Sequence, residues 1–351
     1  MKDELHVRAH VSGGVGRLTL DRPRALNALD LDMIRELRVA LDRWAVDRRV
    51  RVVLLDGAGD RGFCAGGDVR ALRLFILAGE LERVATFFRE EYAVNALIGE
   101  YPKPVVTLAD GVTMGGGIGL AGHAQVRIVT ERSILAMPET GIGFTPDVGG
   151  SLLLSRAPGR LGEFLALTGK AVNGVDAIFA GLADHLVDST ALGSFVRTLT
   201  AGAEIDEALE AAAAPPHPPQ GDLEEARAWV DVAFSAGSLP EIITHLRNAP
   251  HVEAGQTAEL LERLSPTALA VTLESVRRAR EIGHLRTVLE QEYRLAMWFA
   301  STQEDMPEGI RAVLVDRDRT PHWSPPTLAQ LPPQLLSEAF GFVPTTSSTQ
   351  E

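Results

Sequence analysis

In the first half of the chain, segments with strand-like spacing of apolar residues alternate with segments of helix-like spacing. Four apolar runs predict strands, at residues 15–20, 51–55, 104–108 and 126–129. Asp30 opens a segment whose apolar residues recur at helical spacing, and further helices are expected after Asp68 and over about 80–98. Strands that alternate with helices need crossover connections. The pattern as far as Val187 therefore predicts an α/β domain.

The second half of the chain has a different periodicity. From Asp222 to Phe299 the apolar spacing is nearly all helical, and residues 309–315 predict a short strand or helix. The Ala- and Pro-rich stretch 211–219 is typical of a linker or surface loop. We predict three regions: a core over residues 1–200, a helical region over 201–325 and a poorly ordered tail over 326–351.

Composition and charge narrow the class of protein. The chain has 351 residues, of which 45% are hydrophobic, enough for a sizeable core, and its formal net charge is −13. A negative charge argues against non-specific binding to nucleic acid or to an anionic membrane. Cys64 is the single cysteine, which excludes an intramolecular disulfide and a multi-cysteine metal site. No apolar run reaches about 18 residues and the N-terminus lacks a signal-peptide pattern, so we expect a cytoplasmic protein.

Two glycine-rich segments offer bare backbone N–H groups. Gly67 lies between the strand at 51–55 and the helix after Asp68, where it presents its N–H to a ligand or simply forms a turn. Residues 115–117 are three glycines before another helix, which favours close approach of the backbone to a ligand or to a neighbouring strand. If the N–H groups of Gly67 and Gly116 both face a ligand, they form an oxyanion hole, in which each donor is worth about 10²–10³ in rate.

Two carboxylates stand eight positions apart in an otherwise uncharged stretch. Glu139 lies among apolar residues, where burial would raise its pKa and make it a useful base. Asp147 stands shortly before two glycines. The alternative interpretation makes Glu139 a surface or capping residue and Asp147 the N-cap of the next helix. Oxyanion donors together with a buried carboxylate predict chemistry at a carbonyl group.

Two other patterns compete with this interpretation. Residues 117–122 match G-x-G-x-x-G, but the preceding strand ends near Leu108, too far upstream for the tight turn of a dinucleotide-binding fold. Cys64 and His123 have the residue types of a nucleophile and its base, yet nothing in the sequence brings them together. We therefore favour neither a dinucleotide-dependent oxidoreductase nor a thiol enzyme.

The order of these motifs along the chain resembles that of the enoyl-CoA hydratase/isomerase (crotonase) superfamily. Three segments carry the general likeness: residues 20–29, 63–68 and 114–117. Further segments resemble the 3-hydroxyisobutyryl-CoA hydrolase branch of that superfamily: residues 87–92, 137–140, 146–150, 265–267, 292–295 and 308–316. The likeness extends from about Val15 to about Trp323 and rests on many separate motifs.

This resemblance implies a fold and a set of site residues. The fold is an α/β spiral of repeated ββα turns with a C-terminal helical region beside the acyl-CoA site. The implied residues are the oxyanion donors Gly67 and Gly116 and the substrate-contacting acids Glu91, Glu139 and Asp147. We add Asp68, which directly follows the first oxyanion donor, as a predicted substrate contact.

One departure from the hydratases of this superfamily decides between reactions. Those enzymes use two glutamates to add water to a double bond; the second corresponds to Glu139, whereas the position of the first is Gly119. The resemblance therefore predicts thioester hydrolysis, with 3-hydroxyisobutyryl-CoA of valine breakdown as the substrate. Glu139 would act as a general base, or as a nucleophile that forms a mixed anhydride. Asp147 would hold the substrate hydroxyl or assist proton transfer, and Glu91 would line the pocket.

The remaining expectations concern partners and alternatives. The small-molecule partner is an acyl-CoA, whose phosphates would meet Arg22, Arg24 or Arg70. Neither a metal nor a redox cofactor is required, since coenzyme A is part of the substrate. A homo-oligomer is compatible with the resemblance, because trimer-based assemblies are frequent in the superfamily. Two alternatives stay open: a hydratase or isomerase of the same superfamily, and a non-catalytic acyl-CoA-binding protein.

Overall fold

The computed structural model describes residues 5–212, 214 and 217–344. Internal packing divides the chain into two compact units, each assembled from segments that are distant in sequence. The first unit comprises residues 1–67, 93–136 and 171–224, and the second comprises residues 68–92, 137–170 and 225–351. The regions predicted from the sequence, with boundaries at residues 200 and 325, do not coincide with these two units, and that division stays a prediction.

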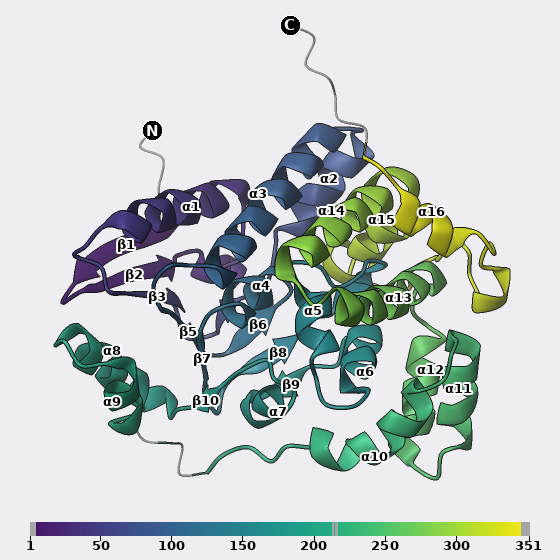
Figure 1. The fold of residues 1–351 in the computed structure, drawn as a ribbon. Coiled ribbons are helices and arrows are strands. Elements are labelled where there is room, and N and C mark those ends of the chain that lie inside the picture. The colour runs from purple at the N-terminus through teal and green to yellow at the C-terminus, as the bar shows by residue number, and fades with distance from the viewer. Residues whose placement is uncertain (1–4, 213, 215–216, 345–351) are drawn as a thin grey trace, which may run out of the picture. The chain divides into compact units, whose positions relative to one another are not determined.

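A six-stranded sheet is the main element of the first unit (Figure 1). Its strands lie in the order β1-β2-β3-β5-β7-β10; the β1–β2 pair is antiparallel and the other pairs are parallel. Their bounds in that order are Val7–Ser12, Val15–Leu20, Val52–Gly57, Val105–Ala109, Val126–Val129 and His185–Leu186. Every residue of β5 is buried, which explains why this parallel strand has a continuous apolar run.

A second, four-stranded sheet in the same unit has the order β4-β6-β8-β9. Its strands are short: Gly62–Cys64, Val112–Met114, Ile134–Ala136 and Val172–Asn173. Successive turns of the chain contribute one strand to each sheet, β3 then β4, β5 then β6, and β7 then β8. Helix α4 (Gly116–Gly122) follows the second of these pairs. This repetition confirms the spiral of ββα turns.

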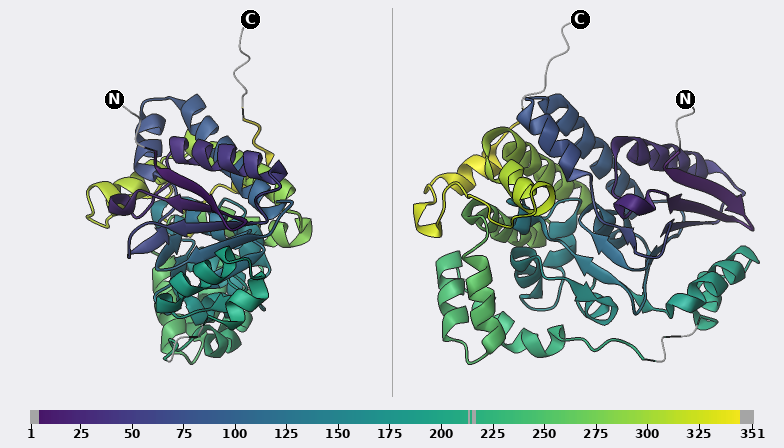
Figure 2. Two further views of the ribbon diagram at one scale, coloured as in Figure 1. Left: turned by 90° about the vertical axis from the view of Figure 1, so that its left-hand side faces the viewer. Right: turned by 180° about the vertical axis from the view of Figure 1, so that it is seen from behind.

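Helices cover both faces of the six-stranded sheet (Figures 1 and 2). Helix α1 (Leu31–Val46) begins at its N-cap Asp30, and its buried Trp44 packs so closely on β2 that Gly16 has no room for a side chain. On the opposite face, α8 (Leu192–Thr200) and α9 (Ile205–Glu210) pack against β2, β3, β5 and β7, with Phe195 at the contact. Three shorter helices complete the unit: η1 (Pro23–Ala25), α7 (Gly174–Phe179) and η3 (Ser189–Ala191).

The described part of the second unit is built from helices. Those that lie wholly within it are α2 (Val69–Leu77), η2 (Glu139–Ile142), α5 (Gly150–Ser155), α6 (Leu161–Thr168), α11 (Leu239–Asn248), α12 (Val252–Leu261), α13 (Pro266–Ile282), α14 (Leu285–Thr302), α15 (Asp305–Ile310), η4 (Arg311–Val315), η5 (Leu328–Gln330) and α16 (Leu335–Gly341). Helices α3 (Leu81–Gly99) and α10 (Leu223–Phe234) have residues in both units.

Helix α13 is the element against which much of the second unit packs. It begins at Ser265, whose hydroxyl accepts the Ala268 N–H at 2.9 Å, and Pro266 occupies its first position. It contacts α5, α6, α14 and α16, and its Ala279 belongs to a buried apolar cluster with residues of α5 and α14. No helix in the described part of the chain combines the length and the apolar character needed to cross a membrane.

The strands and helices predicted for the first half are confirmed within a few residues, and the second half is helical as predicted. Strand β1 was missed because only one of its six residues is fully buried. Residues 309–315 are helical rather than a strand. Residues 335–341 of the predicted tail form α16, with Leu335 and Ala339 buried, so this part is not irregular. Residues 213 and 215–216 of the predicted linker and residues 345–351 of the tail lie outside the described residues.

Candidate active site

The N–H groups of Gly67 and Gly116 belong to two loops of the first unit that touch each other. Gly66 and Gly115, the residues just before them, have φ angles of +100° and +49°, a region that favours glycine. A side chain added to Gly66 would come within 3.4 Å of the Gly116 nitrogen. Neither N–H has a hydrogen-bond acceptor among the described residues. Both amides therefore remain able to donate to a ligand.

Helix α4 explains the rest of the glycine run. Gly116 is its first residue, so its N–H has no partner within the helix. Gly117 faces β4, where an added side chain would lie 2.2 Å from the Cys64 carbonyl oxygen, so close helix–strand packing explains this glycine. Residues 117–122 lie inside this buried helix rather than in a turn after a strand. The dinucleotide-binding interpretation is therefore wrong.

Asp68 is the N-cap of helix α2 in the second unit. Its carboxylate accepts the Ala71 N–H at 3.4 Å. Its contact with a substrate stays a prediction.

Four carboxylic acids of the second unit interact with one another, and we call them the acid cluster. Its members are Glu91 of α3, Glu139 of η2, Asp147 of the loop before α5 and Glu292 of α14. The structure thus brings together the three acids that the resemblance implied and adds a fourth. All four side chains are buried, with exposed fractions of 7% or less.

Glu139 is fixed by the short helix that it opens. Its carbonyl oxygen accepts the Phe144 N–H at 3.0 Å, and the hydroxyl of the next residue, Thr140, donates to the Leu167 carbonyl at 3.1 Å. Its carboxyl oxygen Oε2 is buried and has no hydrogen-bond partner among the described residues. A surface role is excluded because Glu139 is buried, and a capping role because Pro138 is the N-cap of η2 and no side chain caps this helix.

Asp147 is held at the tip of its side chain by Tyr92. The Tyr92 hydroxyl donates to Asp147 Oδ2 at 2.6 Å. The backbone then turns sharply, since Val148 and Gly149 have φ angles of +54° and +78°. Gly149, not Asp147, is the N-cap of α5. The capping interpretation of Asp147 is therefore wrong.

Aromatic side chains pack around Tyr92, and Glu91 directly precedes Tyr92 on helix α3. Phe88 packs against Tyr92 with ring centroids 5.8 Å apart and stacks on Phe144 at 6.0 Å; Phe144 meets Phe299 edge to face at 5.4 Å. Glu91 lies on the same helix as Phe88, and its Oε1 has no hydrogen-bond partner among the described residues. The acids are thus held in apolar surroundings.

Burial, with no paired cation, sets the pKa values of the acid cluster. No Lys or Arg in the described ranges pairs with any of its members. Burial raises the pKa of Asp147 to about 7 and that of Glu292 to about 8. Burial, and then the charge of Asp147, hold the pKa values of Glu91 and Glu139 well above the usual range. Because like charges in a dry site do not all ionise together, the cluster retains protons at neutral pH and titrates as a group.

The arginines considered for CoA phosphates differ in how far they are already engaged. Arg22 pairs with Asp30 at 3.1 Å, and Arg70 donates to the Leu314 carbonyl at 2.7 Å. Arg24 is exposed in η1. Arg24 is therefore the most available of the three, and its contact with a phosphate stays a prediction.

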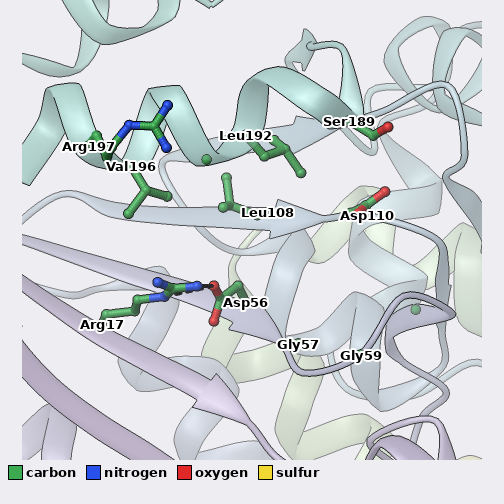
Figure 3. A pocket seen from close by; sticks show the side chains of 12 residues that line it. Arg17, Asp56, Gly57, Gly59, Leu108, Asp110, Ser189, Leu192, Val196 and Arg197 are labelled. Carbon is green, nitrogen blue, oxygen red and sulfur yellow. Dashed lines mark hydrogen bonds and ion pairs between the residues drawn. The ribbon is translucent and has the colours of Figure 1, made fainter.

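A pocket of about 480 Å³ in the first unit includes none of the predicted site residues. Figure 3 shows Arg17 and Asp56 on its sheet side and Leu192 and Val196 of α8 across from them. Arg17 Nε donates to Asp56 Oδ2 at 2.8 Å. Asp56 is thus paired with a cation, unlike the acids of the acid cluster.

Tyr92 and Glu292 are the residues of this region that sequence reasoning left without a role. Both lie in hydrolase-like segments, 87–92 and 292–295, so a motif was the available signal. Tyr92 is 55 positions from Asp147, and Glu292 is 143 positions from its partner Gly149. Only the tertiary structure shows which residues they bind.

Comparison with known proteins gives consistent results over most of the chain. Residues 15–340 match the family model described as enoyl-CoA hydratase/isomerase. The 3-hydroxyisobutyryl-CoA hydrolase, mitochondrial, of Danio rerio is 41% identical over 336 residues, which cover 93% of this chain and 87% of that protein. The human protein of the same name is 38% identical over 93% of this chain and 86% of its own length.

Solved structures share the fold and carry other names. A carnitinyl-CoA dehydratase from Mycobacterium thermoresistibile is 45% identical and covers 98% of both chains, with a TM-score of 0.91. An enoyl-CoA hydratase from Rhodobacter sphaeroides 2.4.1 is 40% identical, covers 95% of this chain and 96% of its own, and has a TM-score of 0.87. The similar proteins therefore agree on the fold, while their names differ in the reaction.

Proposed function

The chain belongs to the enoyl-CoA hydratase/isomerase family, and on that premise we propose that it is an acyl-CoA thioester hydrolase. Its proposed substrate is 3-hydroxyisobutyryl-CoA, which water converts to 3-hydroxyisobutyrate and the CoA thiol. One observation carries the proposal. Glu139 and Asp147 are buried together without a cation, in a chain that has Gly119 where the hydratases have their first glutamate.

The proposed oxyanion hole consists of the Gly67 and Gly116 N–H groups. When a nucleophile adds to the thioester carbon, the carbonyl oxygen becomes an anion, and two fixed N–H donors stabilise it. The two loops touch, and neither amide is engaged by another group of the described chain. Both observations support this role.

Glu139 is proposed to act on the thioester carbon directly or through water. As a general base it takes a proton from water; the hydroxide adds to the carbon, the tetrahedral anion collapses, and the C–S bond breaks with return of the proton to sulfur. As a nucleophile it displaces the thiolate to form a mixed anhydride, which water then hydrolyses. Its unpaired Oε2 and raised pKa support either route.

The proposed roles of the other acids follow from their open hydrogen-bonding capacity. The Tyr92 hydroxyl donates to Asp147 Oδ2, and Oδ1 is proposed to accept the substrate hydroxyl or to assist proton transfer. Glu91, with its unpaired Oε1, lines the acyl pocket. Asp68 is proposed as a further substrate contact. The acids accept hydrogen bonds when ionised, which favours an acyl group that carries a hydroxyl donor.

The proposal also covers the pathway, the oligomeric state and the cellular location of the protein. The chemistry requires no group beyond the CoA of the substrate, and valine breakdown is the proposed pathway. A homo-oligomer is part of the proposal because such assemblies are frequent in the superfamily. The curated relatives carry the word mitochondrial in their names, whereas the location that we propose for this chain is the cytoplasm.

The test is a thiol-release assay with a matched set of thioesters. 3-Hydroxyisobutyryl-CoA should release CoA, whereas isobutyryl-CoA, which lacks the hydroxyl, should show kcat/KM lower by about tenfold to a hundredfold because the polar acceptors lose their partner. Loss or gain of enoyl absorbance with crotonyl-CoA or carnitinyl-CoA, without thiol release, would establish a hydratase or dehydratase instead. Calorimetric binding of all four thioesters without turnover would establish a non-catalytic binding protein.

A further inference from the structure

Glu292 is the member of the acid cluster that the proposed reaction does not use. Its side chain is fully buried in α14 and receives three hydrogen bonds. Oε2 accepts the Gly149 N–H at 2.6 Å, and Oε1 accepts the Ser151 N–H at 3.1 Å and the Ser151 hydroxyl at 2.5 Å. Each oxygen accepts a backbone N–H, so a carboxyl group fits this place and a carboxamide, whose NH₂ group cannot accept, does not.

These three bonds hold the turn that follows Asp147. Val148 is β-branched and has a φ of +54°, a conformation that is strained for such a residue, and Gly149 continues the turn at +78°. The Gly150 N–H returns to the Asp147 carbonyl at 2.6 Å. The N-cap of α5 offers no side chain, so Glu292 binds N–H groups at the start of that helix in its place.

We infer that Glu292 is a positioning residue that holds the strained turn 147–149 and so fixes the place from which Asp147 acts. Asp147 is then constrained twice, by Tyr92 at the tip of its side chain and by Glu292 through the backbone that follows it. In the proposed function Asp147 touches the substrate and Glu292 does not. The kinetic test of this inference rests on the proposed function, because it measures thiol release. The hydrogen-exchange test does not.

The kinetic test compares Glu292→Gln with a control of equal burial. Glu292→Gln turns an NH₂ group toward a backbone donor, so the turn should relax and kcat should fall about tenfold to a hundredfold with little change in KM, since misplacement by about 1 Å has effects of this size. Ser151→Ala removes one of the three donors and should lower kcat by less than Glu292→Gln does. Glu163→Gln alters an equally buried glutamate elsewhere in the unit and should leave kcat unchanged.

A double-mutant cycle separates positioning from a general structural role. If Glu292 acts through Asp147, then adding Glu292→Gln to Asp147→Asn should lower kcat no further, because the group being positioned is already disabled. Losses that multiply instead would overturn the inference. Melting temperatures of all variants, measured in the same buffer, show whether each is folded at the assay temperature.

Hydrogen exchange provides a readout that does not depend on activity. Peptides that cover residues 145–153 should exchange faster in Glu292→Gln than in wild type or Glu163→Gln, because either the Gly149 or the Ser151 amide loses its acceptor. Unchanged exchange in this segment contradicts the inference even if the enzyme is slower. Faster exchange together with a wild type that releases no thiol would uphold the positioning role and reject the proposed function.

Discussion

Glu163 and Glu292 are equally buried glutamates of the second unit, yet their surroundings are opposite. Arg160 and Arg280 both donate to Glu163, at 2.8 to 3.1 Å. Burial raises the pKa of Glu163, but the bonds from Arg280 and Arg160 outweigh it and bring the pKa below the usual value. Glu292 receives only uncharged donors, so burial prevails and its pKa rises to about 8.

This difference separates acids that serve stability from acids available for chemistry. An arginine-paired glutamate stays ionised and saturated with hydrogen bonds, so it has no capacity left for a substrate. The acid cluster has no cation and leaves Glu91 and Glu139 with unpaired oxygens. Buried acids in this condition are unfavourable for folding, and such groups are concentrated at functional sites. The acids assigned to the proposed reaction are therefore the members of the acid cluster other than Glu292, and Glu163 has no part in it.

The largest expected effect follows from removing the carboxylate at position 139. Glu139→Gln keeps the size of the side chain but can neither accept a proton nor attack, so kcat for thiol release should fall by about 10³ or more. The melting temperature should not fall, because a buried carboxyl group without a cation is replaced by a neutral amide. Turnover within tenfold of wild type would remove Glu139 from the mechanism.

Asp147→Asn should have the next largest effect. The amide retains a partner for the Tyr92 hydroxyl but loses the ability to transfer a proton, so kcat should decrease about a hundredfold. Steady-state thiol release measures the decrease, and near-ultraviolet circular dichroism checks the fold. A change confined to KM would mean that Asp147 only binds the substrate hydroxyl.

Tyr92→Phe should raise the pKa of Asp147 while leaving its carboxyl group in place. The phenol donates to Asp147 and lowers its pKa, so its loss should move the pH midpoint of activity upward and reduce kcat about tenfold at pH 7. The reduction should disappear in alkaline buffer. A loss of equal size at every pH would indicate a packing defect instead.

Glu163→Gln should have the smallest effect on catalysis and a clear effect on stability. It leaves two arginines without their carboxylate, so the free energy of unfolding should decrease by roughly 1–3 kcal/mol, less than for a fully buried pair because both arginines are about one-third exposed. Chemical denaturation measures this decrease. If kcat decreased together with the free energy of unfolding, the distinction between Glu163 and the acid cluster would be contradicted.

Part of the candidate site could be predicted from the sequence. The glycine runs and the two acids in an uncharged stretch identified Gly67, Gly116, Glu139 and Asp147 as candidates, because both patterns are local. Tyr92 and Glu292 could not be assigned, since their partners lie 55 and 143 positions away. The short strands of the second sheet were missed for a related reason: three residues are too few to show a period.

The most direct test of the central claim is the pH dependence of thiol release by the wild-type protein. If the acids that lack a cation hold protons near neutrality and must lose them to act, kcat/KM should still be rising as the pH passes through neutrality, because burial raises the pKa of Asp147 to about 7 and holds that of Glu139 well above its usual range. A profile that is flat from about pH 5.5 upward would contradict the account, because an ordinary carboxylate with a pKa of about 4.3 is already ionised there.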